Sequence, residues 1–515
     1  MTALRPSAEP SARARPPRVL LAGSLVTGVL VAIPFLYLVV RTGEAGWADV
    51  QPLLLRFRTL ELAFNSVALA VSVAAGCLLI GVPTAWLITR ADLPWAPMWR
   101  VVAVLPLAVP SYVAAYAWVA TWPGLDGFVG SVLVLTLVSS PYVIIPVAAA
   151  LRRADRDVED VARTLGRSPW GAARSTVWPQ IAPAAGAGTL LAALYALSDF
   201  GAVAVMRFEA FTYGILLAYR VGFDRTLAAV MALVLTALAL LVVLAERWFR
   251  GSAVRRQPPA GSGRPAPIRS LGRGTVPALT GLAAVAVLAL GVPIVSLFVR
   301  LAEGTARGLE WDELRAAAVA TLTVSSIGAV IAILMALPVG LLAARYHGRG
   351  VVALESASYL GNALPGIVVG LSLVFFTISV VPSLYQTSLA LAFAYAVMFL
   401  PKAVGSVRAG MAQVPPGLED AARTLGYSPV QVWRAVTARI ALPGITAGAL
   451  LVALTAMKEL PATLLLRPTG MDTLATEMWS RTTVNAYGSA APYAVTLMLV
   501  ASVPAYLLSR PERRT

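Results

Sequence analysis

Twelve apolar runs constrain the fold of this chain more than any other feature of its sequence. Each is close to the roughly 20 residues that a helix needs to cross the hydrocarbon core of a bilayer. The chain of 515 residues is 58% apolar and only 13% charged, with a mean hydropathy of +0.77, which is typical of polytopic membrane proteins. We therefore predict an all-α membrane protein with about 12 transmembrane helices, at residues 19–40, 63–89, 101–120, 129–150, 184–206, 227–246, 276–299, 316–343, 352–381, 386–404, 445–466 and 490–509.

Three of these runs differ from a simple membrane crossing. The run at 19–40 follows a basic N-terminus, as in a signal peptide, but it is too long and lacks a small-residue cleavage site. We expect it to remain as the first span. The runs at 63–89 and 352–381 are longer than a crossing requires, so we expect a tilt, a kink or a turn outside the membrane.

The distribution of Lys and Arg predicts the orientation. With the N-terminus in the cytoplasm, cytoplasmic segments hold 29 of the 41 basic residues, outer loops hold 11, and Lys458 lies within a span. Such a bias is typical of multi-pass membrane proteins with the basic side inside, and it places both termini in the cytoplasm. It also accounts for the net charge of +16 through topology and contacts with anionic membrane lipid, so we predict no nucleic-acid partner.

A short polar sequence occurs twice, 260 residues apart. Residues 158–169 read VEDVARTLGRSP and residues 418–429 read LEDAARTLGYSP, with nine of twelve positions identical. Each copy predicts a helix that begins with paired acids and ends at a glycine, followed by a serine N-cap and a proline that start a second helix. The residues are Glu159, Asp160, Gly166, Ser168 and Pro169 in the first copy, and Glu419, Asp420, Gly426, Ser428 and Pro429 in the second.

The similarity between the two halves extends beyond these loops. VPTAWLITR at 82–90 aligns with LPVGLLAAR at 337–345, and Pro110 aligns with Pro365. Because the loop recurs after six crossings, the repeat is parallel. We predict a first half at 1–246 with its loop at 155–180, a flexible cytoplasmic linker at 247–275 that is rich in Pro, Gly and Arg, and a second half at 276–515 with its loop at 415–440.

The repeated loop resembles the cytoplasmic signature of permeases of binding-protein-dependent ABC importers, Glu-Ala-Ala followed after three residues by Gly. Here Asp replaces the Glu in both copies, and Val161 replaces the first Ala in one. The resemblance implies a type I ABC importer permease, in which these loops are coupling helices that seat in ATPase subunits. Carried over, the coupling residues are Glu159, Asp160, Ala162, Gly166, Glu419, Asp420, Ala422 and Gly426.

The energy source must then lie in partner subunits. A phosphate-binding loop needs Gly-Lys-Ser or Gly-Lys-Thr, whereas the two lysines of this chain follow Pro401 and Met457. The resemblance implies two copies of a separate ATPase, which would hold ATP and Mg²⁺, and a soluble or lipid-anchored binding protein that docks on the outer loops at 207–226 and 467–489. For this chain we predict no bound cofactor and no enzymatic activity, since it also lacks His-Glu-x-x-His and Gly-x-Ser-x-Gly motifs.

Charged residues within the spans are a second candidate site. Asp199 precedes Gly201 in one span, and Lys458 and Glu459 precede Pro461 in its equivalent. Charge at such depth is costly and usually faces a partner or a water-filled path, and proline can open a helix. We weigh two interpretations evenly: these residues line the translocation pathway or gate, or they form structural ion pairs, Asp199 with Lys458 or Lys458 with Glu459.

The substrate is suggested by resemblance alone. SDFGAVAVMR at 198–207 and MKELPATLLLRPTGMDTLATEMW at 457–479 are similar to fused permeases of ferric iron importers in the bacterial inner membrane. Thiamine, phosphonate and polyamine permeases share the arrangement and stay as alternatives. With one Cys, one His and no acid group at ligand spacing, the sequence predicts no metal site of its own. An ion-coupled secondary transporter is the alternative from another class.

Overall fold

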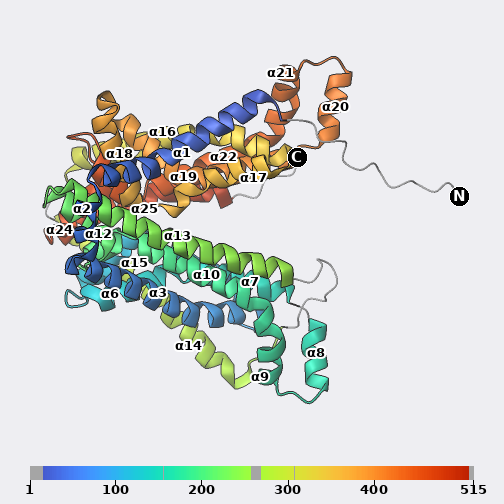
Figure 1. Cartoon of the computed structure of the whole chain (residues 1–515). Helices are drawn as coiled ribbons and strands as arrows, with labels where there is room; N and C mark the ends of the chain where they lie inside the picture. The colour runs from blue at the N-terminus through green and yellow to red at the C-terminus, as the bar shows by residue number, and fades with distance from the viewer. Residues whose placement is uncertain (1–15, 155, 257–267, 307, 510–515) are drawn as a thin grey trace. The chain divides into compact units, whose positions relative to one another are not determined.

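The computed structural model describes residues 16–154, 156–256, 268–306 and 308–509, and these are almost wholly helical (Figure 1). Among the described residues, ten helices are long and apolar enough to cross a membrane, or eleven if one bent pair forms a single span. The predicted all-α polytopic class is confirmed. The predicted number of about 12 spans is higher because two of the apolar runs are broken.

The first half of the chain contains thirteen α-helices and two short helical turns. They are α1 (Arg18–Glu44), α2 (Trp47–Leu55), α3 (Phe57–Arg90), α4 (Ala96–Val102), η1 (Leu105–Ala108), α5 (Ser111–Thr121), α6 (Gly127–Ser139), α7 (Pro141–Arg153), α8 (Arg156–Thr164), α9 (Pro169–Ala172), η2 (Ala173–Val177), α10 (Trp178–Ser198), α11 (Gly201–Val205), α12 (Phe211–Arg220) and α13 (Arg225–Arg256).

The second half follows a similar order from residue 272 onward, with the single helix α19 in the place of α6 and α7 and no counterpart of α2. It contains η3 (Gly272–Gly274), α14 (Thr275–Ala286), η4 (Val287–Gly291), α15 (Val292–Ala306), α16 (Trp311–Arg345), α17 (Arg349–Ser358), η5 (Leu360–Ala363), α18 (Gly366–Ser379), η6 (Pro382–Leu384), α19 (Ser388–Ala412), α20 (Pro416–Thr424), α21 (Pro429–Val432), η7 (Trp433–Thr437), α22 (Ala438–Ala456), α23 (Pro461–Leu466), α24 (Leu474–Thr483) and α25 (Tyr487–Ser509).

The third span of each half is broken at the same place. In the first half the helical segment that ends at Ala108 and the one that begins at Ser111 are bent by 92°. Val109 and Leu364, which precede the aligned prolines Pro110 and Pro365, have extended backbones with ψ of 123° and 124°. A proline disfavours the helical conformation of the residue before it, so the same break recurs in both copies. It divides the run predicted at 352–381 into α17, η5 and α18.

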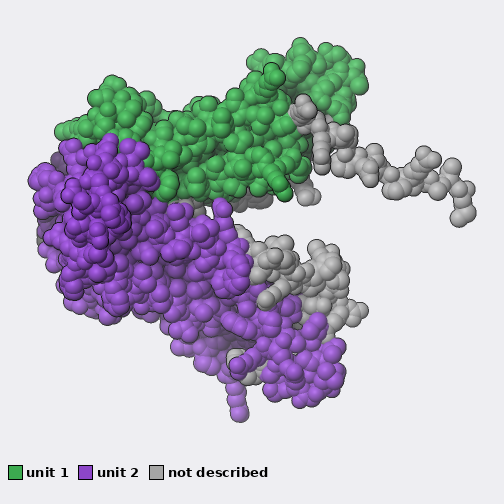
Figure 2. Space-filling model, in the orientation of Figure 1, with its two compact units in different colours: residues 1–37, 315–473, 499–515 green, residues 38–314, 474–498 purple. Residues whose placement is uncertain are grey.

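The chain packs as two compact units that do not coincide with its two halves in sequence (Figure 2). Unit 1 comprises residues 1–37, 315–473 and 499–515, and unit 2 comprises 38–314 and 474–498. Most of α1 therefore packs with spans of the second half, and α14 and α15 pack with spans of the first. The boundaries that we predict at 246 and 276 describe the sequence repeat and stay a prediction.

Specific contacts hold each exchanged helix in its unit. In unit 1, the Thr27 hydroxyl donates to the carbonyl of Met335 at 3.0 Å, and a Cβ at Gly23 would lie 3.0 Å from Pro338. In unit 2, the Ser296 hydroxyl donates to the carbonyl of Ala117 at 3.0 Å. Small residues and interhelical hydrogen bonds of this kind stabilise helix pairs in membranes, where burial of apolar surface supplies little driving force.

Both described ends of the linker predicted at 247–275 have local structure, and its flexibility stays a prediction. Helix α13 continues to Arg256, and residues 257–267 lie outside the described part. At the other end, the Arg269 amide donates to the carbonyl of Arg90 at 2.8 Å, and the Asp92 amide donates to the carbonyl of Arg269 at 2.9 Å. This parallel bridge attaches the end of the linker to the end of α3.

Candidate functional site: the two coupling loops

Both repeated loops fold as the sequence predicts at their glycines. Gly166 and Gly426 have φ of 84° and 86°, and each follows a short helix, α8 or α20 (Figure 1). The amide of Arg167 donates to the carbonyl of Ala162 at 3.2 Å, and that of Gly166 to the carbonyl of Arg163 at 3.0 Å. This pair of bonds is the Schellman motif, and it recurs in the second loop. The helices begin a few residues before the paired acids, at Arg156 and Pro416.

A second helix begins at the predicted proline in each loop. The Ser428 hydroxyl accepts from the amide of Gln431, and the Gln431 side chain accepts from the Ser428 amide at 2.8 Å, which completes a capping box. In the first loop the Ser168 hydroxyl accepts from the amide of Gly171 at 3.1 Å. Each short helix then enters the next span through a π-helical turn, η2 or η7, which the sequence analysis missed.

In the second loop, a partly buried ion pair ties α20 to the transmembrane helix α16. Arg345 donates to both carboxylate oxygens of Glu419, at 2.8 and 2.9 Å, and the Thr437 hydroxyl donates to the same carboxylate. Burial alone would raise the pKa of Glu419, but the hydrogen bonds from Thr437 and Arg345 outweigh it, so this pKa lies below its usual range. Glu419 therefore anchors the loop as a carboxylate.

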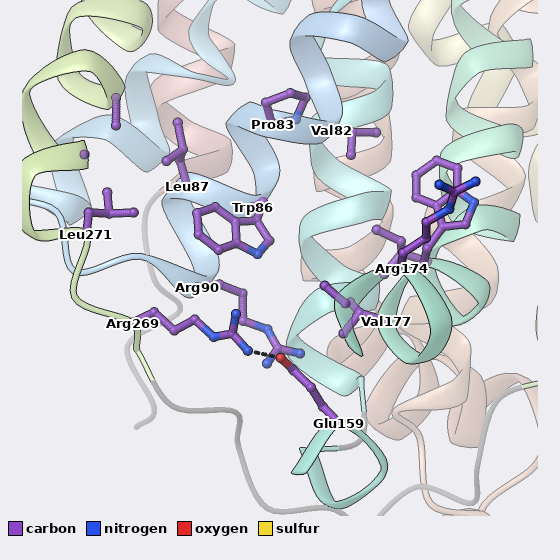
Figure 3. A pocket seen from close by; sticks show the side chains of 15 residues that line it. Val82, Pro83, Trp86, Leu87, Arg90, Glu159, Arg174, Val177, Arg269 and Leu271 are labelled. Carbon is purple, nitrogen blue, oxygen red and sulfur yellow. Dashed lines mark hydrogen bonds and ion pairs between the residues drawn. The ribbon is translucent and has the colours of Figure 1, made fainter. Parts of the chain in front are cut away.

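The first loop is anchored through a different arginine. Glu159 is 5% exposed and pairs with Arg269, which comes from the end of the linker (Figure 3). Arg90 occupies the position that corresponds to Arg345, but its guanidinium donates to the carbonyl of Leu151 at 2.8 Å. Sequence reasoning missed both anchoring arginines. Arg345 had a signal, since it is the last residue of the aligned segments, whereas nothing in the linker sequence distinguished Arg269.

The opposite face of each loop is exposed and partly apolar. Leu165 and Leu425, which directly precede the cap glycines, are 78% and 77% exposed. Ala162 and Ala422 are buried, at 7% and 8% exposure, and their role in coupling stays a prediction. Among the paired acids, Asp420 lies on the surface and pairs with Arg423. The exposed leucines are thus the better candidates for contact with another subunit.

The intramembrane acids occupy equivalent places in the two units. Asp199 follows the last residue of α10, and its carboxylate accepts from the Ser111 hydroxyl and, at 2.7 Å, from the amide of Ala202. Glu459 stands between α22 and α23 and accepts from the amides of Ala462 and Thr463 at 3.1 and 3.0 Å. Each acid caps the short helix that follows a broken span, which compensates part of the cost of burial.

The helix break does not depend on Pro461 alone. Pro461 begins α23, as the sequence suggested, but the first half has the same break with Gly201 at the start of α11. Lys458 lies in the same break as Glu459, between α22 and α23. Whether Asp199, Lys458, Glu459 and Pro461 line a pathway stays a prediction. Within the described ranges, no group of three or more His, Cys, Asp or Glu side chains could hold a metal ion.

Comparisons with known proteins agree with this architecture. Residues 78–253 and 336–514 each match the family of binding-protein-dependent transport system inner membrane components. The Fe(3+)-transport system permease protein FbpB 2 of Haemophilus influenzae is 34% identical over 499 residues, which cover 96% of this chain and 99% of that protein. The molybdate/tungstate transport system permease protein WtpB of Thermococcus kodakarensis is 28% identical over 195 residues, which cover 37% of this chain and 79% of that protein.

The two family matches correspond to the two copies of the repeat, and each contains one repeated loop and one capped acid within a predicted span. Together they cover more than half of the chain, and one relative matches it almost from end to end. The chain belongs to the family of binding-protein-dependent transport system inner membrane components, as a permease with both halves fused in one polypeptide.

Proposed function

We propose that this protein is the permease of an ABC importer that moves ferric iron from a binding protein into the cytoplasm. The observation that carries the proposal is the match over 96% of the chain to a relative whose name specifies Fe(3+) transport. Relatives named for molybdate or tungstate align with little more than a third of the chain. Thiamine, phosphonate and polyamine transport stay as alternatives. Iron is here the transported substrate, carried to the permease by the binding protein.

The energy for transport comes, in this proposal, from two copies of a separate ATPase that bind ATP and Mg²⁺. Each copy seats one coupling loop, with Leu165 or Leu425 as the exposed apolar contact. The pairs Glu419–Arg345 and Glu159–Arg269 then determine which part of the permease each loop moves. A force on α20 passes through Glu419 and Arg345 to the end of α16, and a force on α8 passes through Glu159 to Arg269.

The transport cycle that we propose is alternating access. The loaded binding protein docks on the outer segments at 207–226 and 467–489, which contain the short helices α12 and α24. ATP binding closes the ATPase pair, the coupling loops move, and the permease opens outward to accept the substrate. Hydrolysis returns it to the inward state. Both termini and both coupling loops lie on the cytoplasmic side, as the excess of basic residues favours.

Uptake measurements test this proposal. A strain that lacks the gene receives the intact gene or a variant with Gly166→Leu and Gly426→Leu, and uptake of labelled ferric iron and of labelled thiamine is measured. A matched control is Gly281→Leu, since Gly281 also has open space around it but lies in α14. We expect iron uptake with the intact gene and the control, and none with the double variant, although it is made and inserted.

Two other outcomes would change the conclusion. Thiamine uptake in place of iron would retain the importer and replace the substrate. Full uptake by the double variant would contradict the coupling role of the loops. An ion-coupled secondary transporter, the alternative from another class, would sustain uptake in a strain without the partner ATPase, and that result would overturn the importer itself.

A further inference from the structure

A large apolar cavity lies in unit 2 beside the first coupling loop. Its volume is about 880 Å³, within the range of small-molecule binding sites. Its walls come from the end of α3, from η2 and the start of α10, and from the linker end and α14 (Figure 3). Trp86 and Leu87 line one side, and Val177 lines the side opposite. The sequence analysis did not predict this cavity.

Arg90, Arg269 and Glu159 lie together at the coupling-loop end of the cavity, whereas Arg174 extends from η2 on another side (Figure 3). Arg90, Arg174 and Arg269 line the cavity, and Glu159 is the one acid among its fifteen lining residues. Glu159 is already paired with Arg269. Arg90 is 6% exposed, and its Nε has no hydrogen-bond acceptor within the part of the chain that the structure describes. The cavity thus combines an apolar body with a positively charged end, which complements an anionic amphiphile.

We propose that this cavity binds one anionic phospholipid from the leaflet on the coupling-loop side of the membrane. The acyl chains occupy the apolar space between α3, α10 and α14, the phosphate lies beside Arg90, and the exposed Arg174 attracts the headgroup from η2. Two observations favour a lipid: the walls belong to membrane-spanning helices, and the charge has the sign that attracts anionic headgroups.

A segment of the chain itself is a poorer occupant. Residues 257–267 of the linker read QPPAGSGRPAP, which offers no large apolar side chain to fill the space and adds a further arginine. The second coupling loop suggests a substitution that would fill the cavity with one side chain. Position 173 in η2 is Ala, whereas the corresponding residue of η7, 260 positions later, is Trp433. Ala173→Trp therefore introduces a residue that the same π-helical turn already accommodates.

The site is tested by native mass spectrometry of the full-length protein purified in detergent. Phosphatidylglycerol and phosphatidylcholine with identical acyl chains are added, and the lipid retained after detergent removal is counted. We expect one retained phosphatidylglycerol per protein and a clear preference for it over phosphatidylcholine. Ala173→Trp should abolish retention, with the helical content checked by circular dichroism.

A second pair of variants separates charge from folding. Arg174 is exposed, so Arg174→Gln should leave the fold intact and weaken phosphatidylglycerol binding about fivefold, the effect of one basic residue at an anionic membrane surface. Arg434→Gln, at the same position of the second loop, should change nothing. Equal retention of both lipids, an equal effect of the two arginine variants, or undiminished retention by Ala173→Trp would overturn the proposal. A gain of lipid when residues 257–267 are replaced by Gly and Ser would also overturn it, since it would identify the linker as the occupant.

Discussion

Removal of one charge from the second coupling loop should detach that loop from the membrane helices. Glu419→Gln retains the shape of the side chain but loses the carboxylate that accepts two hydrogen bonds from Arg345 and one from Thr437. Charge-assisted hydrogen bonds contribute about 1.5–3 kcal/mol each, but the glutamine keeps one acceptor oxygen and Arg345 is partly exposed. We therefore expect a loss of about 2–3 kcal/mol in the free energy that holds α20 against α16.

Hydrogen exchange measures this free energy directly. Amides of α20, residues 416–424, exchange through local opening, so a loss of 2–3 kcal/mol should accelerate them roughly 30- to 150-fold. Amides of α8 in the first loop should keep their rates, because their anchor is Glu159 with Arg269. In cells, the same variant should reduce uptake while the protein is still inserted.

The control for this experiment is the neighbouring acid. Asp420 makes an exposed pair with Arg423, of a kind that contributes at most about 1 kcal/mol, so Asp420→Asn should accelerate exchange in α20 only slightly. If Glu419→Gln and Asp420→Asn give the same small acceleration, the pair of Glu419 with Arg345 does not hold the loop. If α8 is accelerated as much as α20, the change is a general loss of stability, and the reasoning from a local anchor is refuted.

Three further predictions follow from the same geometry. The pKa of Glu419 lies below its usual range, so its contribution to stability is complete above the unfolded pKa of about 4.5 and is lost as the pH falls through the folded pKa; if the protection of α20 amides relative to their intrinsic exchange rates stays constant as the pH is lowered below 4.5 until the carboxylate is protonated, this reasoning is contradicted. Gly166→Ala should destabilise the first loop by about 1 kcal/mol because φ is 84°, whereas Gly417→Ala, in an ordinary helical conformation, should not; equal melting temperatures would refute it. Asp199→Asn and Glu459→Gln retain an oxygen that caps the next helix, so the melting temperature should change little. They remove a charge from the predicted pathway, so they should lower uptake, and undiminished uptake would exclude a pathway role.

Local features of this protein were predictable because short stretches of sequence determine them. The caps at Gly166 and Ser428 follow from residues within one or two helical turns, and the structure has them as predicted. The membrane class follows from total apolar content. The breaks before Pro110 and Pro365 were present in the sequence, but hydropathy treats each run as continuous and does not record where the backbone leaves the helix.

Contacts between distant segments were not predictable. Helices in a membrane are apolar on every side, so periodicity does not reveal which face meets which neighbour. The sequence therefore does not indicate that the first span of each half packs with the other spans of the opposite half. The pairing of Glu159 with Arg269 was equally hidden, since Arg269 lies in the linker, whereas the residue aligned with Arg345, the partner of Glu419, is Arg90.

The exchange of first spans has a consequence for synthesis. The Thr27 hydroxyl finds its partner carbonyl 308 residues later in the chain, at Met335. At about 5–20 residues per second, translation reaches that partner roughly 15 to 60 s after Thr27 has been made. During this interval the surface of α1 that later contacts Met335 faces lipid. The Thr27 hydroxyl also lies 3.0 Å from the carbonyl of Gly23, one turn earlier in the same helix. This hydrogen bond within α1 satisfies the hydroxyl in the bilayer until the rest of unit 1 has been synthesised.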